Sequence, residues 1–163
     1  MKSEISKFYK IETWDRNPVL RAKCEEIKKI TPELEDLADD MLALMYENDW
    51  VGLAAPQIWK NIRMIVVTSR KETKKWPELA SETAMINPII TEKSQEMIVG
   101  KEACLSVPGI EWDVKRHKNI TVEFTTLKWD KKTKKLKDYN AVIIQHEIDH
   151  LDGILFTDKI IKK

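Results

Sequence analysis

Gln145-His146-Glu147-Ile148-Asp149-His150 is the stretch around which the rest of this 163-residue chain is organised. It follows the apolar run Ala141-Val142-Ile143-Ile144, and the two together predict a helix buried through the middle of a domain. Residues four apart on a helix lie one turn above each other, so His146 and His150 present their imidazoles on one face. Glu147 projects beside them. The pattern is typical of two metal ligands with an adjacent general base.

A catalytic site of the zinc type requires a third protein ligand, because three protein ligands leave one coordination position open. The chain offers one further histidine, His117, and two cysteines, Cys24 and Cys104. Cys104 is the better candidate, because it lies where a short apolar run leads into a Pro-Gly turn that can hold a side chain rigidly. Cys24 lies in a charged stretch, and we interpret it as an incidental or half-buried thiol. A chance histidine pair and a cysteine that only fills a core remain the alternatives to a metal site.

Two further stretches belong with the helical motif. Trp50-Val51-Gly52-Leu53-Ala54-Ala55-Pro56-Gln57 contains small residues that let a substrate approach the backbone closely, and its terminal amide offers two N–H donors. Glu102-Ala103-Cys104-Leu105-Ser106 follows, and then the helical motif. In this order they resemble the motifs of the peptide deformylases, G-x-G-x-A-A-x-Q, E-G-C-x-S and Q-H-E-x-D-H. The third motif is complete here, whereas Trp50 and Ala103 replace glycines of the first two.

The resemblance implies one divalent metal ion per chain, held by Cys104, His146 and His150. It implies iron(II) as the native ion, and zinc, nickel or cobalt can substitute, since one soft thiolate and two imidazoles accept all of these ions. Glu102 is expected to lie behind the ligands and to orient one of them or a loop.

The resemblance also implies the substrate, which is the N-formylmethionyl end of a nascent polypeptide, from which formate is released. Glu147 is expected to act as the general base, and Gln57 and the backbone N–H of Leu105 to stabilise the oxyanion. An extended peptide is expected to pair with an exposed backbone segment while its methionine side chain enters an apolar pocket. The residues expected to make these contacts are Val51, Gly52, Gly109, Val142 and Ile143.

The two departures from the family motifs define specific questions about the site. Trp50 places a large ring at the mouth of the expected substrate groove. Ala103 adds a Cβ beside a metal ligand, which matters if the backbone there requires a positive φ. Neither change removes a chemical group that the reaction uses, so both concern rate and substrate range.

The composition predicts a single catalytic domain covering residues 1–163, with 42% hydrophobic residues. Twenty-eight basic and 27 acidic side chains give a net charge of +1, so no global field favours nucleic acid or a membrane. Neither a signal peptide nor an apolar run of roughly 18 residues is apparent. Two cysteines cannot form a disulfide framework, and a thiolate reserved for metal must stay reduced. We therefore expect a cytoplasmic protein, with an organelle or a phage-infected host cytosol left open.

The predicted fold class is α+β, with antiparallel or mixed β-sheets packed around the buried helix that carries the metal-binding motif. A first helix is predicted from Thr31, its N-cap, through about Tyr46. Strands are predicted at 62–68, 84–90, 96–99 and 119–129, with Pro88 at an edge or bend. Residues 69–83 are expected to form a charged surface loop, and 131–135 the lysine-rich tip of a hairpin. Arg116 and Asp149 are candidates for an ion pair.

Two other functions remain open on the sequence. The helical motif also fits a metalloprotease, although a Cys-His-His set lacks the usual third ligand of those enzymes. The second alternative is a divergent, catalytically weak or inactive member that binds peptide N-termini, against which the intact Glu147 and Gln57 argue. Transient association of the lysine-rich segment with the ribosome is considered as well. Neither a specific nucleic-acid partner nor a membrane partner is expected.

Overall fold

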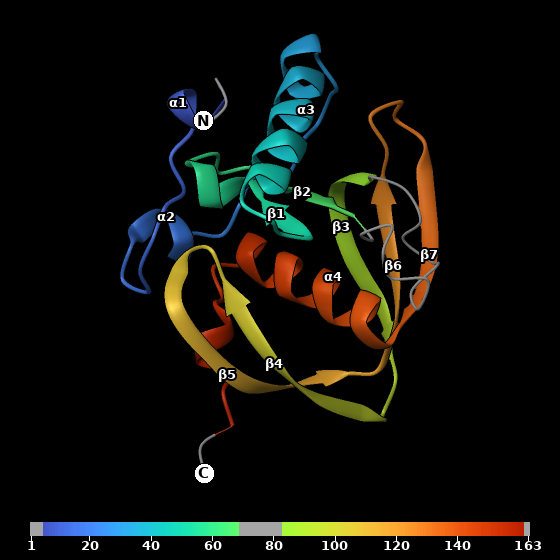
Figure 1. The fold of residues 1–163 in the computed structure, drawn as a ribbon. Helices are drawn as coiled ribbons and strands as arrows, with labels where there is room; N and C mark the ends of the chain where they lie inside the picture. The colour runs from blue at the N-terminus through green and yellow to red at the C-terminus, as the bar shows by residue number, and fades with distance from the viewer. Residues whose placement is uncertain (1–4, 69–82, 162–163) are drawn as a thin grey trace.

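The computed structural model describes residues 5–68 and 83–161 and shows an α+β fold with antiparallel sheets, which confirms the predicted class (Figure 1). One sheet has the strand order β1-β2-β3-β6-β7, and a second sheet pairs β4 with β5. A single parallel bridge, between Glu25 and Ile62, is present in the described residues. The strands are β1 (Gly52–Ala54), β2 (Met64–Val67), β3 (Thr83–Lys93), β4 (Met97–Cys104), β5 (Val107–His117), β6 (Asn119–Thr125) and β7 (Lys131–Lys137).

Helix α4 (Asp138–Leu151) lies between the two sheets and contacts strands of both (Figure 1). Its apolar residues are buried on more than one side, as a helix covered on several faces requires. Gln145 joins the helix to β5, because its Nε2 donates to the His117 carbonyl (2.8 Å) and its Oε1 accepts from the His117 N–H (3.1 Å). The histidines of the motif are therefore carried by an element that is anchored on two sides.

Helix α3 (Pro32–Glu47) is confirmed with Thr31 as its N-cap. Its apolar stripe packs on β1 and β2 and forms a cluster that we call the α3 cluster. Burial of such a stripe supplies most of the stability of an amphipathic helix. The buried members of the cluster are Ile27, Leu37, Ala38, Met41, Leu44, Met45, Leu53, Ala55, Ile58, Met64, Val66 and Ile86.

Four short helical segments complete the described elements. They are α1 (Ile5–Phe8), α2 (Pro18–Arg21), η1 (Ala55–Ile58) and η3 (Phe156–Asp158). The predicted loop at 69–83 lies almost entirely outside the described residues. Among the helices of the described ranges, none combines the length and the apolar content that a membrane span requires.

The hairpin that carries Cys104 was only partly predicted. The strand expected at 96–99 continues to Cys104, and its partner β5 was missed. The chain turns at Leu105 and Ser106, whereas Pro108 and Gly109 belong to β5. The apolar residues Ile110, Trp112 and Val114 alternate with charged residues along β5, so the sequence contained a strand pattern that the prediction did not use.

The lysine-rich segment is wrongly predicted as a hairpin tip. It forms strand β7, and the connecting turn lies at 126–130, where Trp129 has a φ of 64°. Strand β7 is the last strand of the larger sheet, so its lysines reach solvent while Leu136 faces the core. Lysines on an edge strand also oppose pairing with other chains.

Strand β3 is longer than predicted and lies in the middle of its sheet, so of the two positions expected for Pro88 the bend is correct. The register shifts between Ile86 and Ile89, and Asn87 there has a φ of 49°. The Asn87 side chain accepts from the Ile27 N–H (2.9 Å) and donates to the Ile27 carbonyl (2.8 Å). The bulge is therefore fixed by two hydrogen bonds to a neighbouring segment.

Replacing Gly153 with alanine is expected to destabilise the fold. Gly153 follows α4 with a φ of 72°, and a Cβ there would collide with the carbonyl group of Arg21. We expect Gly153→Ala to lower the free energy of unfolding by about 2 kcal/mol or more, measured by urea denaturation. Gly100→Ala is the matched control, because a Cβ at Gly100 meets nothing within 4 Å. Equal losses in the two variants would contradict this account.

Candidate metal and catalytic site

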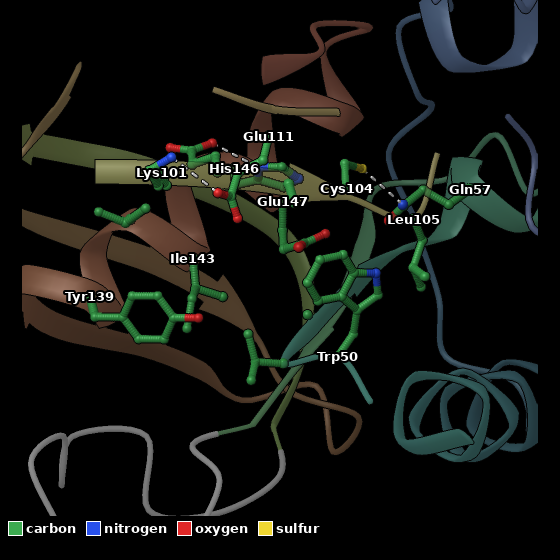
Figure 2. Close-up of a pocket in the computed structure, with 15 residues that line it drawn as sticks. Trp50, Gln57, Lys101, Cys104, Leu105, Glu111, Tyr139, Ile143, His146 and Glu147 are labelled. Atoms are coloured by element: carbon green, nitrogen blue, oxygen red, sulfur yellow. Dashed lines mark hydrogen bonds and ion pairs between the residues drawn. The ribbon is translucent and has the colours of Figure 1, made fainter. Parts of the chain in front are cut away.

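A cavity of about 190 Å³ opens between α4, the segment that leads into β1, and the β4–β5 hairpin (Figure 2). Its lining includes residues 50–52, Gln57 of η1 and residues 101–105. Helix α4 contributes Tyr139, Val142, Ile143, His146 and Glu147. The three sequence motifs, which are far apart along the chain, thus meet in one cavity.

Cys104, His146 and His150 form the group of the described residues that could hold a metal ion. Their ligand atoms lie within 4.8 Å of one another, and all three residues are buried. Cys104 Sγ lies 3.3 Å from His150 Nε2. The last residue of β4 thus faces two histidines one helical turn apart, as expected for a mononuclear site. His117 and Cys24 lie outside the group.

The charges of this group favour metal binding. Burial alone would raise the pKa of the Cys104 thiol, but His150 and His146 outweigh that effect and hold the pKa well below its ordinary value. A thiolate is the form of cysteine that binds metal. By contrast, burial raises the pKa of the Cys24 thiol to about 11. Cys24 is buried in the core rather than half-buried, and it remains a neutral packing residue.

Glu102 lies directly behind one ligand. Its Oε2 accepts a hydrogen bond from His146 Nδ1 (2.9 Å), which leaves His146 Nε2 for a metal. Arg116 donates to both oxygens of Glu102, from Nε (2.7 Å) and from Nη2 (2.9 Å). Burial would raise the pKa of Glu102, but the hydrogen bonds from Arg116 and His146 lower it to about 2. Arg116 also pairs with Asp149 of the helical motif, so this candidate ion pair is present.

Glu147 lies beside the ligand group and against β1. A Cβ at Gly52 would lie 2.5 Å from Glu147 Oε1, so only glycine leaves room for the carboxylate there. Its other oxygen, Oε2, is buried and accepts no hydrogen bond from the described residues. Burial raises the pKa of Glu147 to about 6, against the lowering effect of His146 and His150. A carboxylate with a raised pKa can both accept and return a proton near neutral pH.

Gln57 is held more firmly than the sequence suggested. Its Oε1 accepts from the Ala54 N–H (2.9 Å), and its Nε2 donates to Ser106 Oγ (3.0 Å) and lies 3.5 Å from Cys104 Sγ. The orientation of the amide is therefore fixed, and its N–H groups face the cysteine side of the cavity. Ser106, which is fully buried, was missed as a site residue. Its place in the second motif was the available signal.

Four of the five predicted substrate residues line the cavity, namely Val51, Gly52, Val142 and Ile143. Gly109 is not among the lining residues, and it lies in β5 with a φ of 77°. Lys101, Glu111 and Tyr139 line the cavity without having been predicted. Lys101 Nζ and Glu111 Oε1 form an exposed ion pair (3.3 Å) across the hairpin.

The two departures from the motifs are accommodated. Ala103 lies within strand β4 and is absent from the residues with positive φ, so its Cβ introduces no backbone strain. Trp50 is partly buried at the edge of the cavity and packs against the α3 cluster.

A buried thiolate and two imidazoles, with a carboxylate beside them and an open cavity next to them, are typical of a metal-dependent hydrolase. Comparison with known proteins makes this class specific. A family model described as polypeptide deformylase matches residues 9–163. The peptide deformylase of Finegoldia magna is 39% identical over 147 residues, which cover 90% of this chain and 86% of that protein.

Solved structures agree with this comparison. The peptide deformylase of Thermotoga maritima has a TM-score of 0.86 at 34% identity, covering 95% of this chain and 99% of that one. A class I type b peptide deformylase from Acinetobacter baumannii, with Met-Ala-Ser bound, has a TM-score of 0.87 at 33% identity, covering 98% and 100%. The chain belongs to the polypeptide deformylase family, the hydrolases that remove the N-formyl group from newly made polypeptides. This membership decides against the metalloprotease alternative.

Weakening the support behind His146 is expected to weaken metal binding. Glu102→Gln keeps the shape of the side chain but removes the negative charge of the carboxylate, whose Oε2 accepts the hydrogen bond from His146 Nδ1. We expect a loss of metal affinity of roughly 10- to 100-fold, measured by competition with a chelator. Glu111→Gln is the control, because this carboxylate also lines the cavity but pairs with Lys101. Equal affinity in the two variants would show that Glu102 does not support the ligand.

Proposed function

We propose that this chain removes the formyl group from N-formylmethionyl peptides, with a metal ion held by Cys104, His146 and His150 and with Glu147 as general base. The observation that carries the proposal is the position of Glu147. This residue is buried beside the ligand group, and its Oε2 accepts no hydrogen bond from the described residues. A binding module would not require a buried carboxylate at that point. The cost of burying it argues for a chemical role.

The donor set fits a divalent transition-metal ion. One soft thiolate and two imidazoles accept iron(II), zinc, nickel or cobalt, and we propose iron(II) as the native ion. When bound, such an ion supplies Lewis-acid activation of water and of the formyl carbonyl.

The residues of the chain have separate roles in the proposed reaction. Glu147 accepts a proton from the attacking water and returns it to the amine nitrogen of the departing peptide. The formyl oxygen becomes negatively charged, and the side-chain N–H of Gln57 and the backbone N–H of Leu105 stabilise it. Ser106 holds the Gln57 amide in place, so this donor is fixed before the substrate arrives.

Substrate binding is proposed to use both walls of the cavity. The extended peptide pairs with the backbone at Val51 and Gly52, and its methionine side chain enters the apolar region formed by Val142 and Ile143. The Acinetobacter baumannii relative binds Met-Ala-Ser, the product of such a reaction, and this supports the proposal. The free cysteines suit a reducing compartment such as the cytoplasm, where nascent chains arise.

Formate release from formyl-Met-Ala-Ser tests the proposed function. The purified protein is loaded in turn with iron(II), nickel and zinc under anaerobic conditions, because oxidation of the thiolate would inactivate it. We expect strong activity with iron(II) or nickel, and chelation of the metal should abolish it. Full metal loading without formate release would favour the alternative of an inactive peptide-binding member.

Replacing Glu147 tests its role separately from metal binding. Glu147→Ala removes the proton acceptor and leaves all three proposed ligands, so we expect turnover to fall by roughly 10²- to 10⁴-fold. Metal content, measured by elemental analysis, should not change. Glu123→Ala, an exposed carboxylate on β6, is the control and should retain full activity. Wild-type turnover in Glu147→Ala would refute the proposed role.

A further inference from the structure

Trp50 forms part of the cavity wall, at a position where the first motif of the family has glycine. A backbone hydrogen bond and side-chain packing both fix the position of Trp50. Its N–H donates to the Met45 carbonyl (3.1 Å) directly after α3, and its ring packs against the α3 cluster. Leu105 packs against the same cluster and lines the same cavity. We call these two side chains the Trp50–Leu105 wall, and its backing by a buried core makes it rigid.

The Trp50–Leu105 wall lies across the cavity from the apolar region of α4. Figure 2 shows Trp50 and Leu105 on one side of Glu147, and Tyr139 and Ile143 on the other. Between the two sides, Glu147 packs directly against Gly52, where a Cβ would collide with the carboxylate.

Peptide geometry connects the wall to a particular side chain of the substrate. Successive side chains of an extended peptide point in opposite directions. With the formyl group at Glu147 and the methionine side chain against Val142 and Ile143, the side chain of the following residue points away from α4. The Trp50–Leu105 wall is the surface on that side.

We propose that the Trp50–Leu105 wall contacts the second residue of the substrate and makes the enzyme select formyl peptides with an aromatic or large aliphatic residue at that position. The proposal rests on the proposed function, because it assumes that the formyl group lies at Glu147. An indole face gains from contact with another apolar ring or chain, whereas a small polar side chain leaves this surface in contact with water. A glycine in place of Trp50 would remove most of the wall.

The test compares formyl-Met-Phe-Ser with formyl-Met-Ser-Ser by formate release. We expect the wild-type protein to prefer the phenylalanine peptide in kcat/KM by roughly three- to tenfold. In Trp50→Gly the ratio should fall to about one, and Trp50→Phe should retain most of it. Calorimetric binding of the products Met-Phe-Ser and Met-Ser-Ser to the metal-loaded protein should show the same ratios. Trp129→Gly, in the β6–β7 turn, is the control and should keep the wild-type ratio.

The outcomes separate this inference from the proposed function. No preference in the wild-type protein, or the same preference in Trp50→Gly, would overturn the inference while formate release still supports the function. If no peptide is deformylated, the function fails, and equal binding of the two products would overturn the inference as well. If Trp50→Gly does not fold, Trp50→Leu replaces it. An unchanged ratio in that variant, which lacks the aromatic face, also overturns the inference.

Discussion

The site depends on the ion pairs that the buried guanidinium of Arg116 forms with Glu102 and Asp149. The guanidinium joins Glu102 of β4 to Asp149 of α4, so one side chain of β5 fixes the hairpin to the helix that carries the histidines. Buried charges are tolerated only when they are paired and hydrogen-bonded, and Arg116 is 3% exposed with both carboxylates in contact. Through Glu102 the network reaches His146 Nδ1, so the charge that stabilises the packing of α4 also sets the orientation of a proposed ligand.

A steric constraint complements this electrostatic one. Glu147 cannot leave the cavity, because its helix is buried on several faces, and it cannot move toward β1 without meeting the backbone at Gly52. The carboxylate therefore fits beside the ligand group only because Gly52 has no Cβ. This explains in physical terms why the second glycine of the first motif is retained while the first is replaced by Trp50. Only the second has no space for a side chain.

The sequence predicted the parts of the molecule that have a strong local signal. Helices α3 and α4 are marked by apolar periodicity, and the ligand candidates by their spacing on a helix. The extent of β7 was not predictable in this way, because lysines dominate it and the burial of Leu136 depends on partners distant in the chain. Strand β5 was missed although Ile110, Trp112 and Val114 alternate with charged residues. Ser106 was missed although its place in the second motif was a signal, and contact of Gly109 with the substrate remains a prediction, because Gly109 lies in β5 outside the cavity lining.

Ala103 and Trp50 both replace glycines of the family motifs, but their side chains affect the site differently. Ala103 occupies an extended strand, where any residue adopts the backbone, so its difference from glycine introduces no backbone strain and adds only one methyl group to the cavity lining. Trp50 also fits the backbone, but its side chain extends into the cavity that the substrate is proposed to enter. Two substitutions of glycine thus have different effects on the cavity, because the effect depends on the space in front of each Cα and on the size of the new side chain. That space is set by α4 and the α3 cluster, which the motif itself does not contain.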